Sequence, residues 1–412
     1  MRKVLHLISG GDTGGAKTHI FTLMKGLSGK VDTKIICFIK DTFYEEAKER
    51  GINIEVYPQE KRSDLSVVSK LSDEINKGKY DLVHAHGARA NFICMFLKKK
   101  ISIPMVTTVH SDYKLDFKDS FYKNLIYTTL NKMSLKKFDH YICVSDNFKK
   151  MLVDRGFDRE KIHVLYNGID TEEKIVHDPK TAFLEKHKVN YNGELLVGIA
   201  ARLDKVKDHE TFIKACNEIL KVNPDIIFLI AGEGEEKKNL QEMAKSYGIE
   251  KNIYFLGFVK DKYSFFNAID INVLTSLSES FPYVILEAAL LNVPTVSTKT
   301  GGIPEIIKDD YTGYLFPVGN YKSLSRYILE LYDKRDKLKE LGDNIRKEVI
   351  EKYSHESMGN RQTEIYEEIL RGGKHEDNWQ KGQTFWLNQY SWLVSNYFTN
   401  CTCGCRSKEI WK

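Results

Sequence analysis

The chain has 412 residues, of which 42% are hydrophobic and 29% charged, and its formal net charge is +5 at neutral pH. This length predicts two domains, and the composition is ordinary for a soluble globular protein. No stretch approaches the ~18 apolar residues of a spanning helix, and the apolar run after Met1 is too short for a signal peptide.

The charge is distributed unevenly. Residues 1–170 carry 29 Lys and Arg against 21 Asp and Glu, whereas the remainder carries 33 against 36. A basic first part suggests an anionic partner, such as a membrane surface, although a solvated lysine-rich surface explains the excess equally well. Cys37, Cys94, Cys143 and Cys216 are single cysteines in apolar settings, which is typical of reduced, buried thiols. We therefore predict a cytoplasmic protein.

Short β-branched runs alternate with longer amphipathic stretches along most of the chain. In the first part the expected strands are 4–8, 33–39, 53–57, 82–85, 105–109, 140–144 and 163–166, with helices such as 64–76 and 121–137 between them. This alternation predicts βαβ units in a parallel sheet covered by helices on both faces. Residues 1–170 should form an N-terminal Rossmann-like domain.

A second alternating series follows a connection at residues 171–193, which shows no periodicity. Its expected strands are 196–200, 226–231, 253–256, 271–274, 295–298 and 314–316, and helices at about 321–370 close the series. The prediction is an α/β protein with two doubly wound domains, 1–170 and 194–371, facing each other across a cleft. In such sheets ligands bind at the carboxyl ends of the strands.

The last segment, 372–412, differs in composition, since it holds all four tryptophans and three of the seven cysteines. Its aromatic run at 385–398 could lie in a membrane interface, but an appended segment without a selected role is the favoured interpretation. Cys401, Cys403 and Cys405 stand at alternate positions, which is poor geometry for tetrahedral zinc. No metal site is predicted.

Polar and glycine-rich turns follow several strands of the first domain. Gly14 and Gly15 belong to a turn that follows the first strand and opens a helix, where backbone N–H groups can approach a phosphate. The dinucleotide fingerprint does not fit this turn, and a merely tight turn is the alternative. His86 and His110 end neighbouring strands and should point toward the same ligand, although a single histidine is more often structural.

The second domain repeats this arrangement. Arg202 lies at the exit of its first strand and Lys207 at the start of the next helix, so the two cations could clamp a pyrophosphate leaving group. Gly232 and Glu233 follow the second strand, where a base or ribose could enter. The turn 301–305, Gly-Gly-Ile-Pro-Glu, follows a later strand.

Glu279 and Glu287 flank the start of a helix that should begin at Pro282. Glu279 would lie at the exit of strand 271–274, beside free N–H groups and the positive end of the helix dipole. This arrangement suits a phosphate. The alternative is an ordinary helix start with an N-terminal acid and a salt-bridged surface acid.

Together these motifs resemble the retaining glycosyltransferases of family 4, which have the GT-B fold. The resemblance covers residues 1–370, and its most specific part is the Glu279/Glu287 pair with Ser-Phe-Pro between. It implies that Glu279 meets the donor sugar's hydroxyls, Glu287 the ribose, and Arg202 with Lys207 the diphosphate. Backbone groups of five successive residues would assist: Ser280, Phe281, Pro282, Tyr283 and Val284.

The resemblance also implies that Gly15 approaches the donor phosphate and that His110 lies near the transferred sugar. The expected reaction moves a sugar from a nucleotide diphosphate donor, UDP favoured over GDP, to an acceptor hydroxyl with retention of configuration. The acceptor would be lipid-linked or a glycan in cell-surface polysaccharide or glycolipid assembly, and peripheral binding to the inner membrane face fits the basic first domain. No cofactor and no nucleic acid are expected.

One residue departs from the family pattern: Lys17 stands where members often have an acid, which puts the acceptor contacts in doubt. Two alternatives stay open. One is a sugar phosphorylase or nucleotide-sugar epimerase on the same fold, and the other is a non-catalytic binding module.

Overall fold

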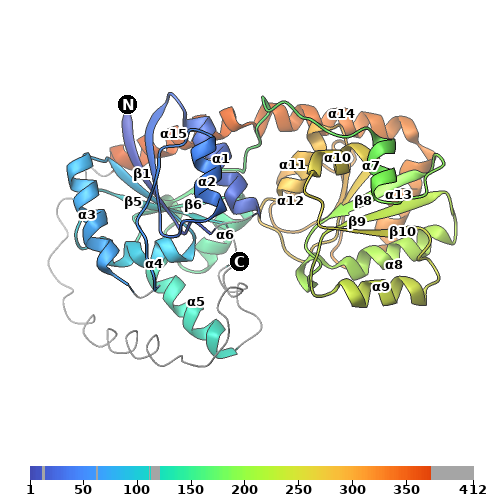
Figure 1. Ribbon diagram of the computed structural model, residues 1–412, viewed down its shortest axis with the longest axis horizontal. Helices are drawn as coiled ribbons and strands as arrows, with labels where there is room; N and C mark the ends of the chain where they lie inside the picture. The colour runs from blue at the N-terminus through green and yellow to red at the C-terminus, as the bar shows by residue number, and fades with distance from the viewer. Residues whose placement is uncertain (12–13, 62–63, 111, 113–120, 373–412) are drawn as a thin grey trace. The chain divides into compact units, whose positions relative to one another are not determined.

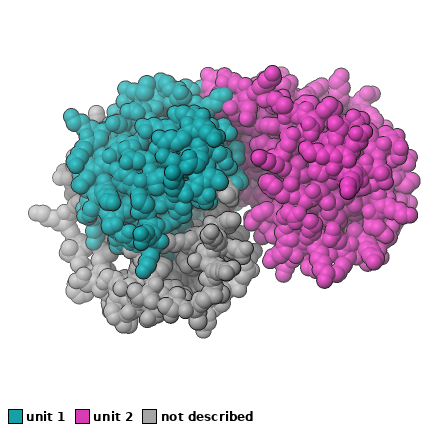
Figure 2. All heavy atoms as spheres, viewed as in Figure 1, with its two compact units in different colours: residues 1–144, 149–165, 358–412 teal, residues 145–148, 166–357 magenta. Residues whose placement is uncertain are grey.

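The computed structural model describes residues 1–11, 14–61, 64–110, 112 and 121–372, and these separate into two compact units (Figures 1 and 2). Of the described residues, unit 1 comprises those within 1–144, 149–165 and 358–372, and unit 2 comprises 145–148 and 166–357. The tail with its four tryptophans lies outside the described residues.

Unit 1 is built on a seven-stranded parallel sheet with the order β3-β2-β1-β4-β5-β6-β7. The strands are β1 (Arg2–Ile8), β2 (Val31–Cys37), β3 (Ile54–Val56), β4 (Leu82–His86), β5 (Met105–Val109), β6 (His140–Cys143) and β7 (Ile162–Val164). In the register of the central strands, Ile8 is paired with His86 and His86 with Thr108. The carboxyl ends of β1, β4 and β5 therefore lie side by side.

The helices of this part of the chain are α1 (Gly14–Leu27), α2 (Thr42–Glu49), α3 (Ser66–Gly78), α4 (Gly87–Leu97), α5 (Phe121–Leu135), α6 (Asp146–Asp154) and the 3-10 turn η1 (Arg159–Lys161). The final helix α15 (His355–Gly372) adds Met358, Ile365 and Tyr366 to the hydrophobic core of unit 1. The predicted second domain, 194–371, included this helix, because the helical periodicity shows a buried face but not which sheet that face covers.

Unit 2 has a six-stranded parallel sheet with the order β10-β9-β8-β11-β12-β13. The strands are β8 (Leu195–Ala200), β9 (Ile226–Ala231), β10 (Ile253–Gly257), β11 (Ile271–Leu274), β12 (Thr295–Thr298) and β13 (Gly313–Phe316). The helices are α7 (Lys180–Lys186), η2 (Lys205–Lys207), α8 (His209–Leu220), α9 (Lys237–Ser246), α10 (Lys262–Ala268), α11 (Tyr283–Leu290), α12 (Ile303–Ile306), α13 (Tyr321–Asp333) and α14 (Arg335–Lys352).

The predicted strands are all present, each within two residues of its expected start, and the α/β prediction of two Rossmann-like domains is confirmed. The structure adds one helix to these expectations and moves the start of another by one residue. The connection 171–193 contains the helix α7, which is too short to show a periodic pattern but buries Phe183 and Leu184. Pro282 occupies the N-cap position of α11, and the helix itself begins at Tyr283.

A search for membrane-spanning helices finds none in the described part of the chain, since no helix there is both long enough and apolar enough.

Candidate active site

Two loops at the carboxyl edge of the unit 2 sheet are bonded to each other. The loop after β8 contains the turn η2, whose first N–H groups are capped by Asp204: its Oδ1 accepts from the backbone N of Val206 at 3.1 Å and of Lys207 at 3.2 Å. The loop after β11 binds this turn, since Thr275 Oγ1 donates to the Lys207 carbonyl at 2.9 Å and Leu277 N to the Val206 carbonyl at 2.8 Å. These bonds hold the Lys207 backbone against the loop that carries Glu279.

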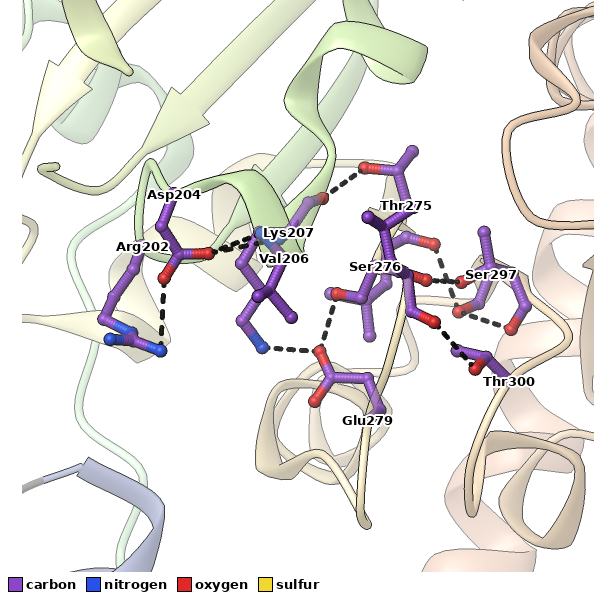
Figure 3. Close-up of polar contacts among 12 residues, drawn as sticks. Arg202, Asp204, Val206, Lys207, Thr275, Ser276, Glu279, Ser297 and Thr300 are labelled. Atoms are coloured by element: carbon purple, nitrogen blue, oxygen red, sulfur yellow. Dashed lines mark hydrogen bonds and ion pairs between the residues drawn. The ribbon is translucent and has the colours of Figure 1, made fainter. Parts of the chain in front are cut away.

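Lys207 and Glu279 form an ion pair at the centre of this arrangement (Figure 3). Lys207 Nζ lies 2.5 Å from Glu279 Oε1, and Ser276 Oγ donates to the same oxygen at 2.6 Å. The two charged side chains are 20% and 9% exposed. Charge-assisted bonds this short in a partly desolvated place orient the carboxylate strongly.

Arg202 stands apart from this pair. Its guanidinium Nη2 lies 3.1 Å from Asp204 Oδ2, and its side chain is 77% exposed. Figure 3 shows it on the opposite side of η2 from Glu279. Arg202 and Lys207 therefore do not converge as expected. Both belong to one loop, but each pairs with a different carboxylate. An exposed guanidinium with a single acidic partner keeps donors available for an anion.

The loop after β12 completes this edge of the sheet and depends on two glycines. Gly301 has a φ of +55°, and a Cβ at this position would overlap the Glu279 carbonyl oxygen. Gly302 N donates to the Ser280 carbonyl at 2.9 Å, and Thr300 Oγ1 donates to the Leu277 carbonyl at 3.1 Å. The Gly-Gly turn therefore packs against the Glu279 loop and fixes its backbone.

The start of α11 lies in the same loop. Pro282 is the N-cap and has no side-chain oxygen to accept from the first helical N–H groups, so no side-chain cap closes this helix end. Phe281 is buried and stacks on Tyr166, with ring centroids 5.2 Å apart. Burial, followed by the charge of Glu287, raises the pKa of Tyr283 well above its usual value. An uncapped helix start in a rigid apolar setting is suited to an anion.

Glu287 lies in the body of α11 and is bound by a lysine from another helix. Lys262 Nζ is 2.6 Å from Glu287 Oε1, and the side chains are 41% and 9% exposed. The two glutamates of the motif therefore lie in separate ion pairs, Glu279 with Lys207 and Glu287 with Lys262.

The turn after β9 brings its backbone close to the same loop as Arg202. Gly232 leaves no space for a Cβ, because the Ala201 carbonyl lies where it would be. Glu233 is exposed and pairs with Lys237 at 2.9 Å within one helical turn. Of these two predicted residues, Gly232 is explained by packing alone, and Glu233 is a solvent-facing carboxylate.

In unit 1, the predicted His86 and His110 lie together. Their ring centroids are 6.1 Å apart, and His19 from α1 lies 4.5 Å from His110 and 6.1 Å from His86. Burial, followed by the neighbouring histidines, lowers the pKa of His86 and His110 well below the usual value. Both rings are therefore neutral at neutral pH, which makes them hydrogen-bonding and ligating groups instead of cations.

The glycine turn of unit 1 is more open. Gly14 has a φ of +59°, which favours glycine, and among the described residues no other atom lies within 4 Å of the place of its Cβ. Gly14 and Gly15 are exposed at the start of α1, while Lys17 is bound to Glu46 at 2.8 Å. Lys17 is thus held by an acid of unit 1.

Five residues that belong to these groups were not predicted as site residues from the sequence: Ser276, Asp204, Lys262, His19 and His6. Asp204 carried a readable signal, because Asp before a turn is a common helix cap. Ser276 and Lys262 carried none, since each acts only through a tertiary partner.

Comparison with known families agrees with this architecture. Residues 13–173 match the model for "Glycosyltransferase Family 4", and residues 181–348 match that for "Glycosyl transferases group 1". Two doubly wound units with polar loops at their strand exits define a GT-B glycosyltransferase fold. The chain belongs to the GT-B glycosyltransferases of family 4.

Several relatives have stated activities. N-acetyl-alpha-D-glucosaminyl L-malate synthase of Bacillus anthracis is 26% identical over 81% of this chain and 86% of its own. An Escherichia coli UDP-Gal:alpha-D-GlcNAc-diphosphoundecaprenol alpha-1,3-galactosyltransferase is 25% identical over 70% of this chain and 75% of its own. Among solved structures, Anabaena HepE in complex with UDP-glucose superposes with a TM-score of 0.75 at 22% identity, over 89% of this chain and 100% of that one.

Proposed function

We propose that the protein transfers a sugar from a nucleotide diphosphate donor to an acceptor hydroxyl with retention of anomeric configuration. The observation that carries the proposal is the Lys207–Glu279–Ser276 cluster beside the uncapped start of α11. It combines an ammonium group, an oriented carboxylate and a helix start without a side-chain cap within one loop system. A diphosphate bears negative charge that grows as its bond to the sugar breaks, and such groups stabilise it.

The proposed reaction needs no base from the protein. The bond between the anomeric carbon and the diphosphate oxygen breaks, and the acceptor oxygen forms its bond to the same face of that carbon. The acceptor's proton passes to the departing diphosphate oxygen. Lys207 and Arg202 stabilise the leaving charge, while the first N–H groups of α11 add the helix dipole.

Glu279 and Glu287 are proposed as donor-binding groups, Glu279 on sugar hydroxyls and Glu287 on the ribose. Retaining glycosidases use two carboxylates about 5 Å apart as nucleophile and acid. Here each glutamate is paired with its own lysine, and Glu279 Oε1 already accepts two short bonds. A carboxylate oxygen so occupied is a weak nucleophile, which supports the binding role.

The donor is proposed to be a UDP-sugar and the acceptor a lipid-linked or glycan hydroxyl. HepE was solved with UDP-glucose, and the Escherichia coli relative acts on a diphosphoundecaprenol acceptor, which supports both choices. The excess of basic residues in 1–170 supports peripheral binding at the inner membrane face. The corresponding use is cell-surface polysaccharide or glycolipid assembly, from the cytoplasmic side.

A donor screen tests the proposal. UDP-, GDP- and other nucleotide sugars are added to the purified chain, and thermal stabilisation and nucleotide release are measured with and without acceptor. One class of nucleotide should stabilise the protein by binding the folded state only, and acceptor should raise the rate of nucleotide release. The anomeric configuration of the product is then read by NMR.

Four results would contradict the proposal in different ways. Stabilisation without turnover on any acceptor indicates a binding module. A phosphate-dependent product indicates a phosphorylase, and a changed donor sugar without transfer indicates an epimerase. An inverted anomeric centre leaves the transfer standing but refutes retention.

A further inference from the structure

Five histidines lie together at the carboxyl edge of the unit 1 sheet. His6 comes from β1, His84 and His86 from β4, His19 from α1, and His110 follows β5. Four of the five are buried, and only His110 is partly exposed. A buried group of this size is unusual for histidine, which generally needs hydrogen-bond partners in the interior.

Part of the group is joined by a chain of hydrogen bonds. Tyr366 Oη lies 2.7 Å from His84 Nδ1 and 3.5 Å from His6 Nε2, and His84 Nε2 lies 2.7 Å from Thr108 Oγ1. His6 Nδ1 is 3.1 Å from His86 Nε2. We assign the phenol proton of Tyr366 to its shorter contact, with His84 Nδ1, so that His6 Nε2–H donates to the phenol oxygen. His6 Nδ1 is then an acceptor, and His86 Nε2–H donates to it.

This assignment has a consequence for His86. Its Nδ1 carries a lone pair, is buried, and has no hydrogen-bond partner in the described part of the chain. His110 Nε2 is likewise buried without a partner there. An unsatisfied buried ring nitrogen destabilises the folded state, so two of them side by side call for a ligand.

The spacing of His19, His86 and His110 fits a metal ion. One ring nitrogen of each lies within 4.8 Å of the others. A tetrahedral zinc ion with Zn–N bonds of about 2.0–2.1 Å separates the ring centres by about 5 Å and the ligand nitrogens by about 3.3 Å. The observed ring-centre distances of 4.5, 6.1 and 6.1 Å bracket the first value. Because the nitrogens lie within 4.8 Å of one another, the rings would have to close by up to about 1.5 Å to reach the second.

We propose that His19, His86 and His110 bind a divalent transition-metal ion, with Zn²⁺ as the reference ion. Imidazole is a preferred ligand of zinc, copper and nickel. The His86 Nε2–H bond to His6 is the outer hydrogen bond that metal-ligating histidines usually make, and it fixes the tautomer that presents Nδ1. Three protein ligands leave a fourth position open for water or an anion, and the partly exposed His110 provides the entry side.

A second set, His6, His84 and His86, also has ligating atoms within 4.8 Å of one another. We favour the His19 set, because both ring nitrogens of His84 and both of His6 have partners already. A metal bound by the second set would have to break these bonds. The two sets share His86, so His110 is the residue that distinguishes them.

The test is metal binding by the purified full-length chain, expressed without a histidine tag. Cys401, Cys403 and Cys405 are changed to serine in the background used, so that thiolates cannot bind the metal. Zn²⁺ is titrated against a chromophoric chelator, and Co²⁺ is added separately to record its visible absorption. Neither readout depends on transferase activity.

The expected result is one metal per chain and the intense Co²⁺ absorption of a tetrahedral site. His110→Ala should weaken binding by at least about tenfold. His19→Gln should do the same, and it keeps a side chain of similar size if the alanine variant fails to fold. His187→Ala, a change at a histidine of unit 2, should leave binding unaltered. The proposal is overturned if Zn²⁺ does not bind below millimolar concentration, or if both His110→Ala and His19→Gln bind as tightly as the background chain.

Discussion

Replacing Lys207 tests the proposed leaving-group stabilisation most directly. In the structure its ammonium group lies 2.5 Å from Glu279 Oε1 on a loop held by Asp204 and Thr275. Removing one such group from the transition state of a charge-developing reaction typically lowers kcat about 10²- to 10³-fold, or about 2.7–4 kcal/mol. We expect Lys207→Ala to fall in this range.

The same change also affects stability. Breaking a buried ion pair by removing one partner costs about 3–5 kcal/mol, whereas an exposed pair is worth about 0–1 kcal/mol. Because Lys207 is 20% and Glu279 9% exposed, we expect a loss of about 1–3 kcal/mol in the free energy of unfolding. The double variant Lys207→Met with Glu279→Gln removes both charges, so it should recover most of this stability but none of the activity.

The assay is the initial rate of nucleotide release with saturating donor and acceptor, combined with urea unfolding of each variant. Lys205→Ala is the matched control, because Lys205 is an exposed residue of the same turn and carries the same charge. It should retain activity within about twofold. A folded Lys207→Ala enzyme with kcat within threefold of the wild type would refute the stabilising role.

Three further outcomes are expected. Lys262→Met should raise the donor KM about fivefold with little change in kcat, since the loss of an orienting bond to Glu287 costs about 1 kcal/mol. Gly301→Ala should lower the unfolding midpoint in urea, because a Cβ would overlap a backbone carbonyl oxygen at a φ of +55°. Burial lowers the pKa of His209 to about 4, so the unfolded chain binds more protons between pH 6.5 and 4, and stability should fall by up to about 3 kcal/mol as the pH drops through this window.

Each of these has a control. Lys260→Met changes an exposed lysine near Lys262 and should leave KM alone; an equal rise in both variants would remove the orienting role. Gly319→Ala is the control for Gly301→Ala, because Gly319 also has a positive φ (+74°) but no other atom of the described chain lies within 4 Å of the place of its Cβ. It therefore shows the effect of backbone strain alone. An equal loss of stability in the two variants would exclude overlap as the cause. His209→Phe should make the fall of stability with pH shallower without removing it, because burial also lowers the pKa of His86 and His110. An unchanged slope would show that His209 does not contribute.

Much of the fold could be predicted from local sequence. The strands Met105–Val109, Ile226–Ala231 and Ile271–Leu274 have the predicted limits, because parallel strands buried on both faces need continuous apolar runs. The Glu279 motif was also visible, since a strand exit, a small-residue loop and a proline at a helix start are all encoded within a dozen residues.

The alternation of elements, the strand exits and the residue types placed there can therefore be predicted from local sequence. Which side chains meet depends on the tertiary fold. Lys207 and Glu279 are 72 residues apart, His84 and Tyr366 are 282 apart, and α15 packs in unit 1 after the whole of unit 2 has been completed. Periodicity is a property of neighbours along the chain, whereas ion pairs and histidine clusters depend on strand order and register, which no local pattern records.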